Sequence, residues 1–145
     1  MVTSTESVLI GRPLPEVFAF TVNLPVRPTW DRDIDAVLHG TESEFGVGRE
    51  YRMRFAPFLS DTEGTLTVVE VAPGERVVEH YDFAGLIWLV ICTYVAEGSD
   101  ATRFTRSVEV EPAGMVKLAT PFLSQRVNRN NRQSLLALKH VLESA

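Results

Sequence analysis

The chain has 145 residues, of which 45% are hydrophobic and 23% charged, and its formal net charge is −5. This hydrophobic fraction excludes a disordered chain, and the length suits one domain, residues 1–145, that needs neither disulfide nor metal to fold. Interspersed acids and bases with an acidic balance argue against a nucleic-acid partner, because such surfaces usually carry clustered basic residues.

The sequence gives no sign of export or of a membrane span. Cys92 is the only cysteine, so no intramolecular disulfide can form and a reducing cytoplasm is expected. Residues 1–11 lack the basic and apolar regions of a signal peptide. The longest apolar stretch, residues 86–92, is too short to span a bilayer, so we expect no stable membrane insertion.

The first thirty residues predict a strand followed by two short helical segments. Residues 3–11 alternate loosely between polar and apolar side chains and end at a glycine, as a strand does. Pro13, Pro15 and Glu16 then predict a short helix, since prolines and an early acid suit a first helical turn. Residues 23–30 hold two more prolines and predict a second short helix or an irregular turn.

A run of strands is predicted next. Residues 50–55 alternate cleanly and place Tyr51, Met53 and Phe55 on one face. Pro73-Gly74 marks a turn between two strands. The six predicted strands cover residues 34–39, 50–55, 62–71, 76–83, 86–96 and 102–111.

The last third of the chain predicts one long helix. Residues 112–114 (PAG) end the final strand, and apolar residues from Val116 to Leu142 then recur with a period near 3.6. Asn131 falls inside this apolar stripe, and Pro121 predicts a kink within the helix. A helix of this kind needs a large apolar surface, which here must be the concave face of one curved sheet. Such an arrangement tends to leave a cavity, so ligand binding is the leading idea.

Several short motifs, in this order, resemble the SRPBCC superfamily (START or Bet v 1-like), and within it the polyketide cyclase/dehydrase-type branch. They are residues 15–20 (PEVFAF), Trp30, residues 46–48 (GVG), residues 71–78 (VAPGERVV) and residues 101–114 (ATRFTRSVEVEPAG). The resemblance covers nearly the whole chain. It implies an α+β helix-grip fold, in which a seven-stranded antiparallel sheet wraps around a long C-terminal helix, with two short helices between strands 1 and 2. It also implies an apolar pocket but no single activity, and no catalytic motif can be carried over.

His80 is one candidate for catalysis. His80 and Asp82 lie two apart on a predicted strand and share a face, where histidine and carboxylate could work as general base and orienter. Neighbours at this spacing are about 7 Å apart, too far for a direct hydrogen bond. If Tyr81 and Phe83 face the interior instead, both polar groups point to solvent, which is the usual pattern.

Arg106 is the second candidate. It shares a face with Phe104, Val108 and Val110, the predicted inner face of its strand. A buried guanidinium needs a partner, because an isolated charge costs several kcal/mol. That partner is an acid on a neighbouring strand, pocket water, or a ligand carboxylate or enolate, and an internal salt bridge or a side chain reaching the rim stays an open alternative.

The expected ligand contacts are mostly aromatic or apolar, because rings pack on apolar ligands and Tyr and Trp also offer one polar group. Ordinary core packing is the competing interpretation for these residues, and a cap or backbone contact is the competing role of Asn131. The complete set is Tyr51, Met53, Phe55, Trp88, Tyr94, Phe104, Arg106, Phe122 and Asn131.

Other chemistries are disfavoured. Cys92 has no neighbouring feature that lowers its pKa, so it is expected to be an inert thiol. His39, His80 and His140 are scattered, so no metal and no cofactor are expected. The basic residues of the last helix, Arg126 among them, are interpreted as a solvated face, with a membrane or anionic partner as a lesser alternative.

We therefore predict a protein that binds a small hydrophobic molecule, such as a polyketide, lipid or aromatic compound, between sheet and C-terminal helix. The alternative is a polyketide cyclase or dehydratase in which Arg106 stabilises an enolate while His80, Tyr51 or Tyr94 moves protons. A docking module has least support, and a homodimer is left open.

Overall fold

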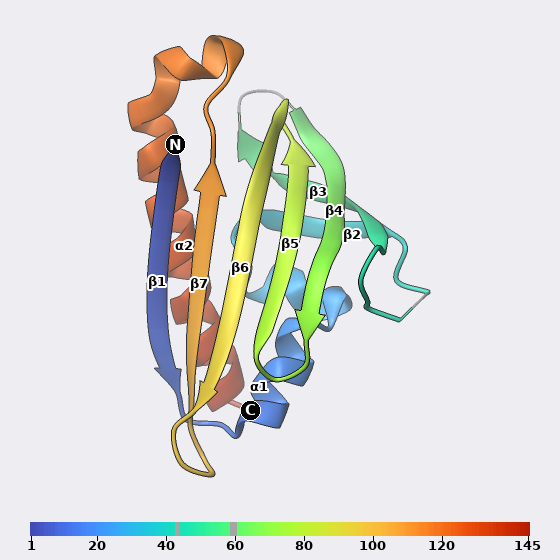
Figure 1. Ribbon diagram of the computed structural model, residues 1–145, viewed down its shortest axis with the longest axis vertical. Helices are drawn as coiled ribbons and strands as arrows, with labels where there is room; N and C mark the ends of the chain where they lie inside the picture. The colour runs from blue at the N-terminus through green and yellow to red at the C-terminus, as the bar shows by residue number, and fades with distance from the viewer. Residues whose placement is uncertain (43, 59–60) are drawn as a thin grey trace.

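The computed structural model describes residues 1–42, 44–58 and 61–145 (Figure 1). Within these residues, seven strands form one sheet in the order β1-β7-β6-β5-β4-β3-β2, and all neighbouring strands are antiparallel. The strands are β1 (Val2–Ile10), β2 (Ile34–His39), β3 (Glu50–Phe58), β4 (Asp61–Ala72), β5 (Arg76–Phe83), β6 (Leu86–Ala96) and β7 (Thr102–Val110). From β2 to β7 each strand pairs with the next along the chain, whereas β1 joins the far edge beside β7.

In the described residues, four helical segments complete the fold. Between β1 and β2 lie α1 (Leu14–Thr21) and the 3-10 helix η1 (Leu24–Thr29), and after β7 come the 3-10 helix η2 (Gly114–Ala119) and α2 (Thr120–Glu143). The predicted order of strands and helices is thus confirmed, including the two short helices after the first strand.

The sheet is strongly curved, and different elements cover different parts of its inner face. In Figure 1, β2 and β3 run across the view behind β4 and β5, and α2 lies behind β1 and β7. Contacts confirm that α2 packs on β1 and β7, while α1 touches β6 and η1 touches β2. The long helix therefore covers the part of the inner face formed by β1 and β7, and α1 and η1 lie over other parts of it.

Strict alternation along the strands builds the core. In β6 the side chains of Leu86, Trp88, Val90, Cys92 and Tyr94 are buried, and the intervening ones are more exposed. Successive strand residues point to opposite faces, so this pattern defines the inner face without ambiguity. Each fully buried large apolar side chain contributes about 1.5–3 kcal/mol to folding.

The C-terminal helix begins later than predicted. We predicted one helix from Met115 with a kink at Pro121, but the structure has η2 first, and Pro121 lies in the opening turn of α2. A proline costs nothing there, because the first backbone N–H groups of a helix have no partner within the helix. Pro121 therefore starts α2 instead of kinking it.

None of the described helices is long and apolar enough to cross a membrane.

Candidate functional site

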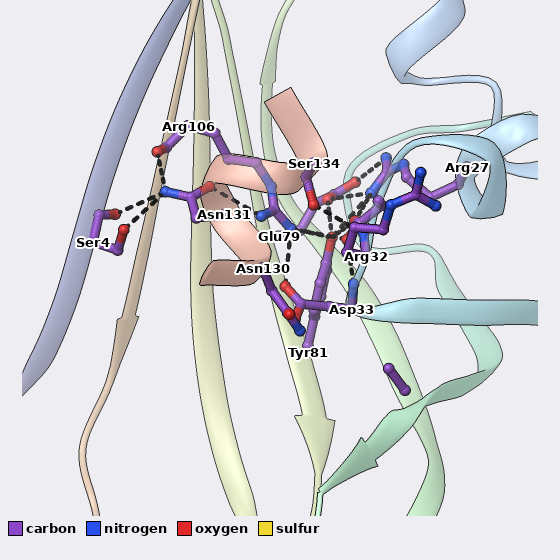
Figure 2. Close-up of polar contacts among 12 residues, drawn as sticks. Ser4, Arg27, Arg32, Asp33, Glu79, Tyr81, Arg106, Asn130, Asn131 and Ser134 are labelled. Atoms are coloured by element: carbon purple, nitrogen blue, oxygen red, sulfur yellow. Dashed lines mark hydrogen bonds and ion pairs between the residues drawn. The ribbon is translucent and has the colours of Figure 1, made fainter. Parts of the chain in front are cut away.

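Arg106 lies at the centre of the molecule with its side chain fully buried. The alternation of β7 turns it inward between Phe104 and Val108. Its guanidinium donates hydrogen bonds to Asp31 Oδ1 (3.1 Å), Asp33 Oδ2 (3.3 Å) and Asn131 Oδ1 (3.1 Å) (Figure 2). The required partner is thus an internal pair of acids, and both come from the connection between η1 and β2.

Arg27 of η1 forms a second buried ion pair. It donates to both carboxylate oxygens of Glu79 at 2.9 Å each, and to the carbonyl oxygen of Thr21 at 3.0 Å. Its guanidinium also lies 5.3 Å from the centre of the Trp30 ring, within cation–π range. This two-point contact with Glu79 is the strong, directional form of an arginine–carboxylate pair, so it ties η1 to β5.

Tyr81 links the two ion pairs. Its hydroxyl donates to Asp31 Oδ2 at 2.6 Å and accepts a hydrogen bond from Arg27 Nη1 at 3.1 Å. Burial raises the pKa of Tyr81 well above 10, and the charge of Asp31 raises it further. The hydroxyl therefore remains a donor at any pH the folded protein encounters.

The two guanidinium groups keep their charge despite their burial. Burial by itself lowers the pKa of Arg106, but Asp31, Tyr81 and Asp33 outweigh it and hold that pKa well above its ordinary value. Burial likewise opposes the charge on Arg27, and Glu79 and its neighbours reverse that effect. Charges out of water are tolerated only when they are paired and hydrogen-bonded in this way.

Helix α2 contributes three buried polar residues to the same region (Figure 2). Asn130 donates to Asp33 Oδ1 at 3.0 Å, and Ser134 Oγ accepts from the backbone N–H of Arg32 at 2.8 Å. Asn131 accepts from Arg106 and donates to the Arg106 carbonyl (2.9 Å) and to Ser4. These contacts fix the rotation of α2 against the sheet. The buried polar cluster, as we call it, comprises Arg27, Asp31, Asp33, Glu79, Tyr81, Arg106, Asn130, Asn131 and Ser134.

A stack of aromatic rings lies on the inner face beside this cluster. Phe83 is nearly parallel to Phe55, with ring centres 4.2 Å apart, and to Trp88, with ring centres 4.8 Å apart. Phe58 meets Trp88 edge to face at 5.9 Å. Offset parallel and edge-to-face contacts are the favourable arrangements of rings, so this wall is well packed.

The structure brings most of the predicted ligand contacts together in the interior. Eight of them are buried: Tyr51, Met53, Phe55, Trp88, Tyr94, Phe104, Arg106 and Asn131. Phe122 does not join them, because its side chain is 71% exposed at the start of α2. His80 is half-buried on the outer face of β5, since Glu79, Tyr81 and Phe83 occupy the inner positions, and Asp82 beside it is exposed.

A pocket of about 170 Å³ opens between η1 and the segment that joins β2 to β3. Its lining combines apolar side chains with a few polar groups: Val22, Asn23, Leu24, Pro25, Thr41, Phe45 and Tyr51. The Tyr51 and Phe45 rings are nearly parallel, with centres 6.2 Å apart. Among the predicted ligand contacts, Tyr51 is the one that lines this pocket.

Tyr51 has a hydroxyl group with little competing hydrogen bonding. Among the described residues its hydrogen bond goes to the carbonyl oxygen of Glu44 at 3.4 Å, near the upper limit for such a bond. Burial raises the pKa of Tyr51 and outweighs the opposing effects of the Gly46 backbone and the charge of Arg49. The group is therefore a protonated donor near neutral pH, facing a pocket next to the buried polar cluster.

Within the described residues, no cluster of three or more His, Cys, Asp or Glu side chains is arranged to hold a metal ion.

Sequence reasoning missed the acidic half of the buried polar cluster. Glu79 was detectable, because it alternates with Val77 and Tyr81 on the inner face of β5. Asp31 and Asp33 carried no such signal, because they lie in a connection whose course no periodicity defines. Arg27 was equally hidden within a proline-rich segment.

Comparison with solved structures gives the same architecture over almost the entire chain. A START superfamily protein from Mycobacterium smegmatis matches with a TM-score of 0.76 and 13% identity, covering 98% of this chain and 97% of that one. A protein from Chromobacterium violaceum matches with a TM-score of 0.70 and 21% identity, covering 99% of each chain. A point mutant of norcoclaurine synthase from Thalictrum, in complex with a transition-state analogue, matches with a TM-score of 0.71 and 12% identity, covering 98% and 94%.

At these identities the likeness establishes the START-like helix-grip fold and nothing about ligand or reaction. No curated protein matches the chain significantly. A family profile described as "Polyketide cyclase / dehydrase and lipid transport" matches residues 1–143. The chain therefore belongs to this polyketide cyclase/dehydrase and lipid transport family of the SRPBCC superfamily.

Proposed function

We propose that the protein binds a small, largely apolar molecule of the polyketide, lipid or aromatic class, and that its ring or chain end occupies the pocket beside Tyr51. The observation that carries this proposal is the composition of the pocket: Val22, Leu24, Pro25 and Phe45 supply apolar walls, and Asn23, Thr41 and Tyr51 supply polar groups. A concave apolar site with a small number of placed polar groups is the usual form of a small-molecule site.

The pocket's size limits what fits inside it. A cavity of about 150 Å³ lined by apolar side chains accommodates a benzene-sized molecule in other proteins. At about 170 Å³, the pocket suits one ring or a short chain segment. The rest of a larger ligand would extend along the opening, past Asn23 and Thr41, which are exposed at the rim.

Tyr51 is the proposed polar contact. The hydrogen bond that its hydroxyl donates, to the Glu44 carbonyl, is long, so a ligand carbonyl or hydroxyl oxygen would offer a better acceptor. The other buried residues of the predicted set would then support the site from behind, and the buried polar cluster would hold η1, one wall of the pocket, through Arg27.

The cyclase alternative gains no separate support from the described residues. Arg106 is enclosed and paired with Asp31 and Asp33, so a substrate would have to displace these acids to reach it. His80 lies on the outer face of β5. We therefore propose binding as the function, and we place it in the cytoplasm on the ground of the lone buried thiol of Cys92.

The test blocks the pocket without touching the core. Thr41→Trp adds a large ring at an exposed rim position, and Thr3→Trp makes the same change at an exposed position of β1. Native mass spectrometry of each purified protein would identify any co-purified molecule, and calorimetry with indole would measure binding of a ring-sized probe. We expect the wild type and Thr3→Trp to bind alike, and Thr41→Trp to bind at least about tenfold more weakly.

Three results would contradict the proposal. They are the absence of both a co-purified molecule and indole binding, equal binding by the two tryptophan variants, or a Tyr51→Phe variant whose affinity for an oxygen-bearing ligand is unchanged. Circular dichroism would first establish that each variant is folded.

A further inference from the structure

Three large apolar side chains project into solvent where β7 leads into α2. Met115 and Leu118 of η2 are each 81% exposed, and Phe122 in the first turn of α2 is 71% exposed. Figure 1 shows this orange segment at one end of the molecule's long axis. We call these three residues the apolar tip.

The apolar tip is held outward by its own segment. Val116 and Leu123, which alternate with the exposed residues, are buried and anchor η2 and α2 to the protein. The segment therefore packs one apolar face against the protein, and its second apolar face, the apolar tip, is exposed to solvent. Single exposed apolar residues are ordinary, but three on successive helical turns at one end of a molecule are not.

The charge of this region differs from that of the rest of the chain. Residues 112–142 contain five of the 14 Lys and Arg residues and none of the 19 Asp and Glu residues. Arg126 is not part of a solvated face as predicted, because it is buried and donates to the carbonyl oxygens of Ala56 (2.8 Å) and Pro57 (2.5 Å). Arg132 and Lys139 pair with Glu6 and Glu143.

Two cations near the tip stay available. Within the described part of the chain, Lys117 and Arg129 form no ion pair, and both are exposed. Lys117 lies within the tip segment. Arg129 follows Phe122 by seven residues on the same face of α2, about 10 Å along the helix, which is close to a Debye length at moderate salt.

This combination fits one kind of partner. Exposed large apolar side chains beside unpaired Lys and Arg are typical of helices that lie at an anionic membrane surface. Glu111, which directly precedes the segment, is paired with the N-terminal ammonium at 3.4 Å. A second copy of the chain fits less well, since a twofold contact would place like charges against each other, and three side chains fall far short of the roughly 20–30 residues per partner of a stable interface.

We propose that the apolar tip inserts into the headgroup region of an anionic lipid bilayer, with Lys117 among the lipid phosphates and Arg129 adding longer-range attraction. Contact is peripheral and reversible, because three side chains reach only the boundary of the hydrocarbon. This inference is independent of the pocket beside Tyr51.

Vesicle flotation tests it with the full-length protein. The vesicles are phosphatidylcholine alone, or phosphatidylcholine and phosphatidylglycerol at a ratio of about two to one. We expect the wild type to float with the mixed vesicles far more than with phosphatidylcholine, and added salt to reduce this binding.

Two triple variants separate the tip from general surface hydrophobicity. The tip variant replaces Met115, Leu118 and Phe122 with serine, and the matched control replaces Ile87, Val95 and Leu136, which are 52%, 58% and 57% exposed elsewhere. We expect the tip variant to lose at least about tenfold in vesicle affinity and the control to bind like the wild type. Lys117→Glu with Arg129→Glu should weaken binding to mixed vesicles alone.

Any of three outcomes would overturn the proposal. The first is a wild type that does not float with mixed vesicles, and the second is an equal loss of binding in both triple variants. The third is that no form binds vesicles, while sedimentation shows a dimer for the wild type and the control but a monomer for the tip variant. The last result would assign the tip to a second copy of the chain. Circular dichroism of each variant would confirm that the serine substitutions leave the fold intact.

Discussion

Asp31 is the residue on which both buried ion pairs converge. Its Oδ1 accepts from Arg106 at 3.1 Å and from the backbone N–H of Asp33 at 3.0 Å. Its Oδ2 accepts from Tyr81 at 2.6 Å and lies 3.6 Å from Arg27 Nη1. Because its charged members and Tyr81 share partners, the buried polar cluster should respond to substitution as a unit and not as a sum of pairs.

The Arg106→Met variant tests this interdependence at a single position. It keeps most of the side chain's bulk but leaves the carboxylate of Asp33 buried without a cation and that of Asp31 with only its longer contact to Arg27, so we expect the free energy of unfolding to fall by about 3–5 kcal/mol. Arg76→Met is the matched control, because Arg76 pairs with Glu70 at 2.7 Å on the surface. Its expected loss is at most about 1 kcal/mol.

Urea unfolding followed by tryptophan fluorescence would measure both losses. Similar losses in the two variants would show that the cluster is not a buried, mutually dependent unit. A variant that leaves Arg106 in place but replaces Asp31 with Asn should also be strongly destabilised, because one acid of the cluster is removed while both guanidinium groups remain.

For single residues, the sequence predicted which way a side chain points better than it predicted which groups that side chain contacts. The parity of β7 placed Arg106 on the inner face and required a partner for it, and the structure confirms the inward position. The identity of the partner was beyond reach, since Asp31 and Asp33 are 75 and 73 residues distant along the chain and follow no repeating pattern. Contacts that depend on how a loop folds over a sheet produce no recognisable pattern in the local sequence.

Among the elements, the pairing of β4 with β5 depends on a glycine. A Cβ at Gly64 would lie 2.0 Å from the carbonyl oxygen of Asp82 and 2.8 Å from Cβ of Phe83, both in β5. Backbone on the neighbouring strand cannot move aside as a flexible side chain would. Gly64 therefore permits the close approach that positions Phe83 within the aromatic stack.

We accordingly expect Gly64→Ala to lower the free energy of unfolding by about 2–4 kcal/mol, through separation of the two strands. Gly46→Ala serves as its control, because no atom lies within 4 Å of a Cβ at Gly46. Thermal unfolding by circular dichroism would compare them, and a Gly64→Ala variant as stable as Gly46→Ala would refute the steric argument.

The strands themselves were predictable because their side chains alternate and prolines or glycines separate them. The bounds of β2, β5 and β6 match the expected residues, and the other strands differ by a few residues at their ends. The start of α2 was not predictable in the same way. Phe122 was predicted as a ligand contact, but it precedes Leu123 of the buried stripe and its own side chain points outward.

For the whole molecule, stability should depend on pH in the alkaline range, because several buried groups are neutral at pH 7 and ionise only at higher pH. The Cys92 thiol is buried on the inner face of β6, and this burial raises its pKa from the ordinary 9.0 to about 12. Burial also raises the pKa values of Tyr81 and Tyr94 well above 10. The folded protein holds these protons at pH values where the unfolded chain releases them.

Between pH 8 and pH 9 the thiol should dominate this effect, because each tyrosine of the unfolded chain, with a pKa near 10, still holds about nine-tenths of its protons at pH 9. The unfolded state then binds fewer protons than the folded state, so the free energy of unfolding falls as pH rises. For one proton the slope approaches about 1.4 kcal/mol per pH unit, and the loss continues until the folded thiol itself titrates near 12.

The Cys92→Ala variant isolates this contribution. It should be less stable than the wild type at pH 8, because it leaves a small cavity, but its stability should be nearly flat from pH 8 to 9. Urea unfolding at closely spaced pH values would measure both slopes. Parallel slopes in the two proteins would mean that the thiol is ionised in the folded protein as readily as in the unfolded chain, and thus that the inner face of β6 is not closed to water.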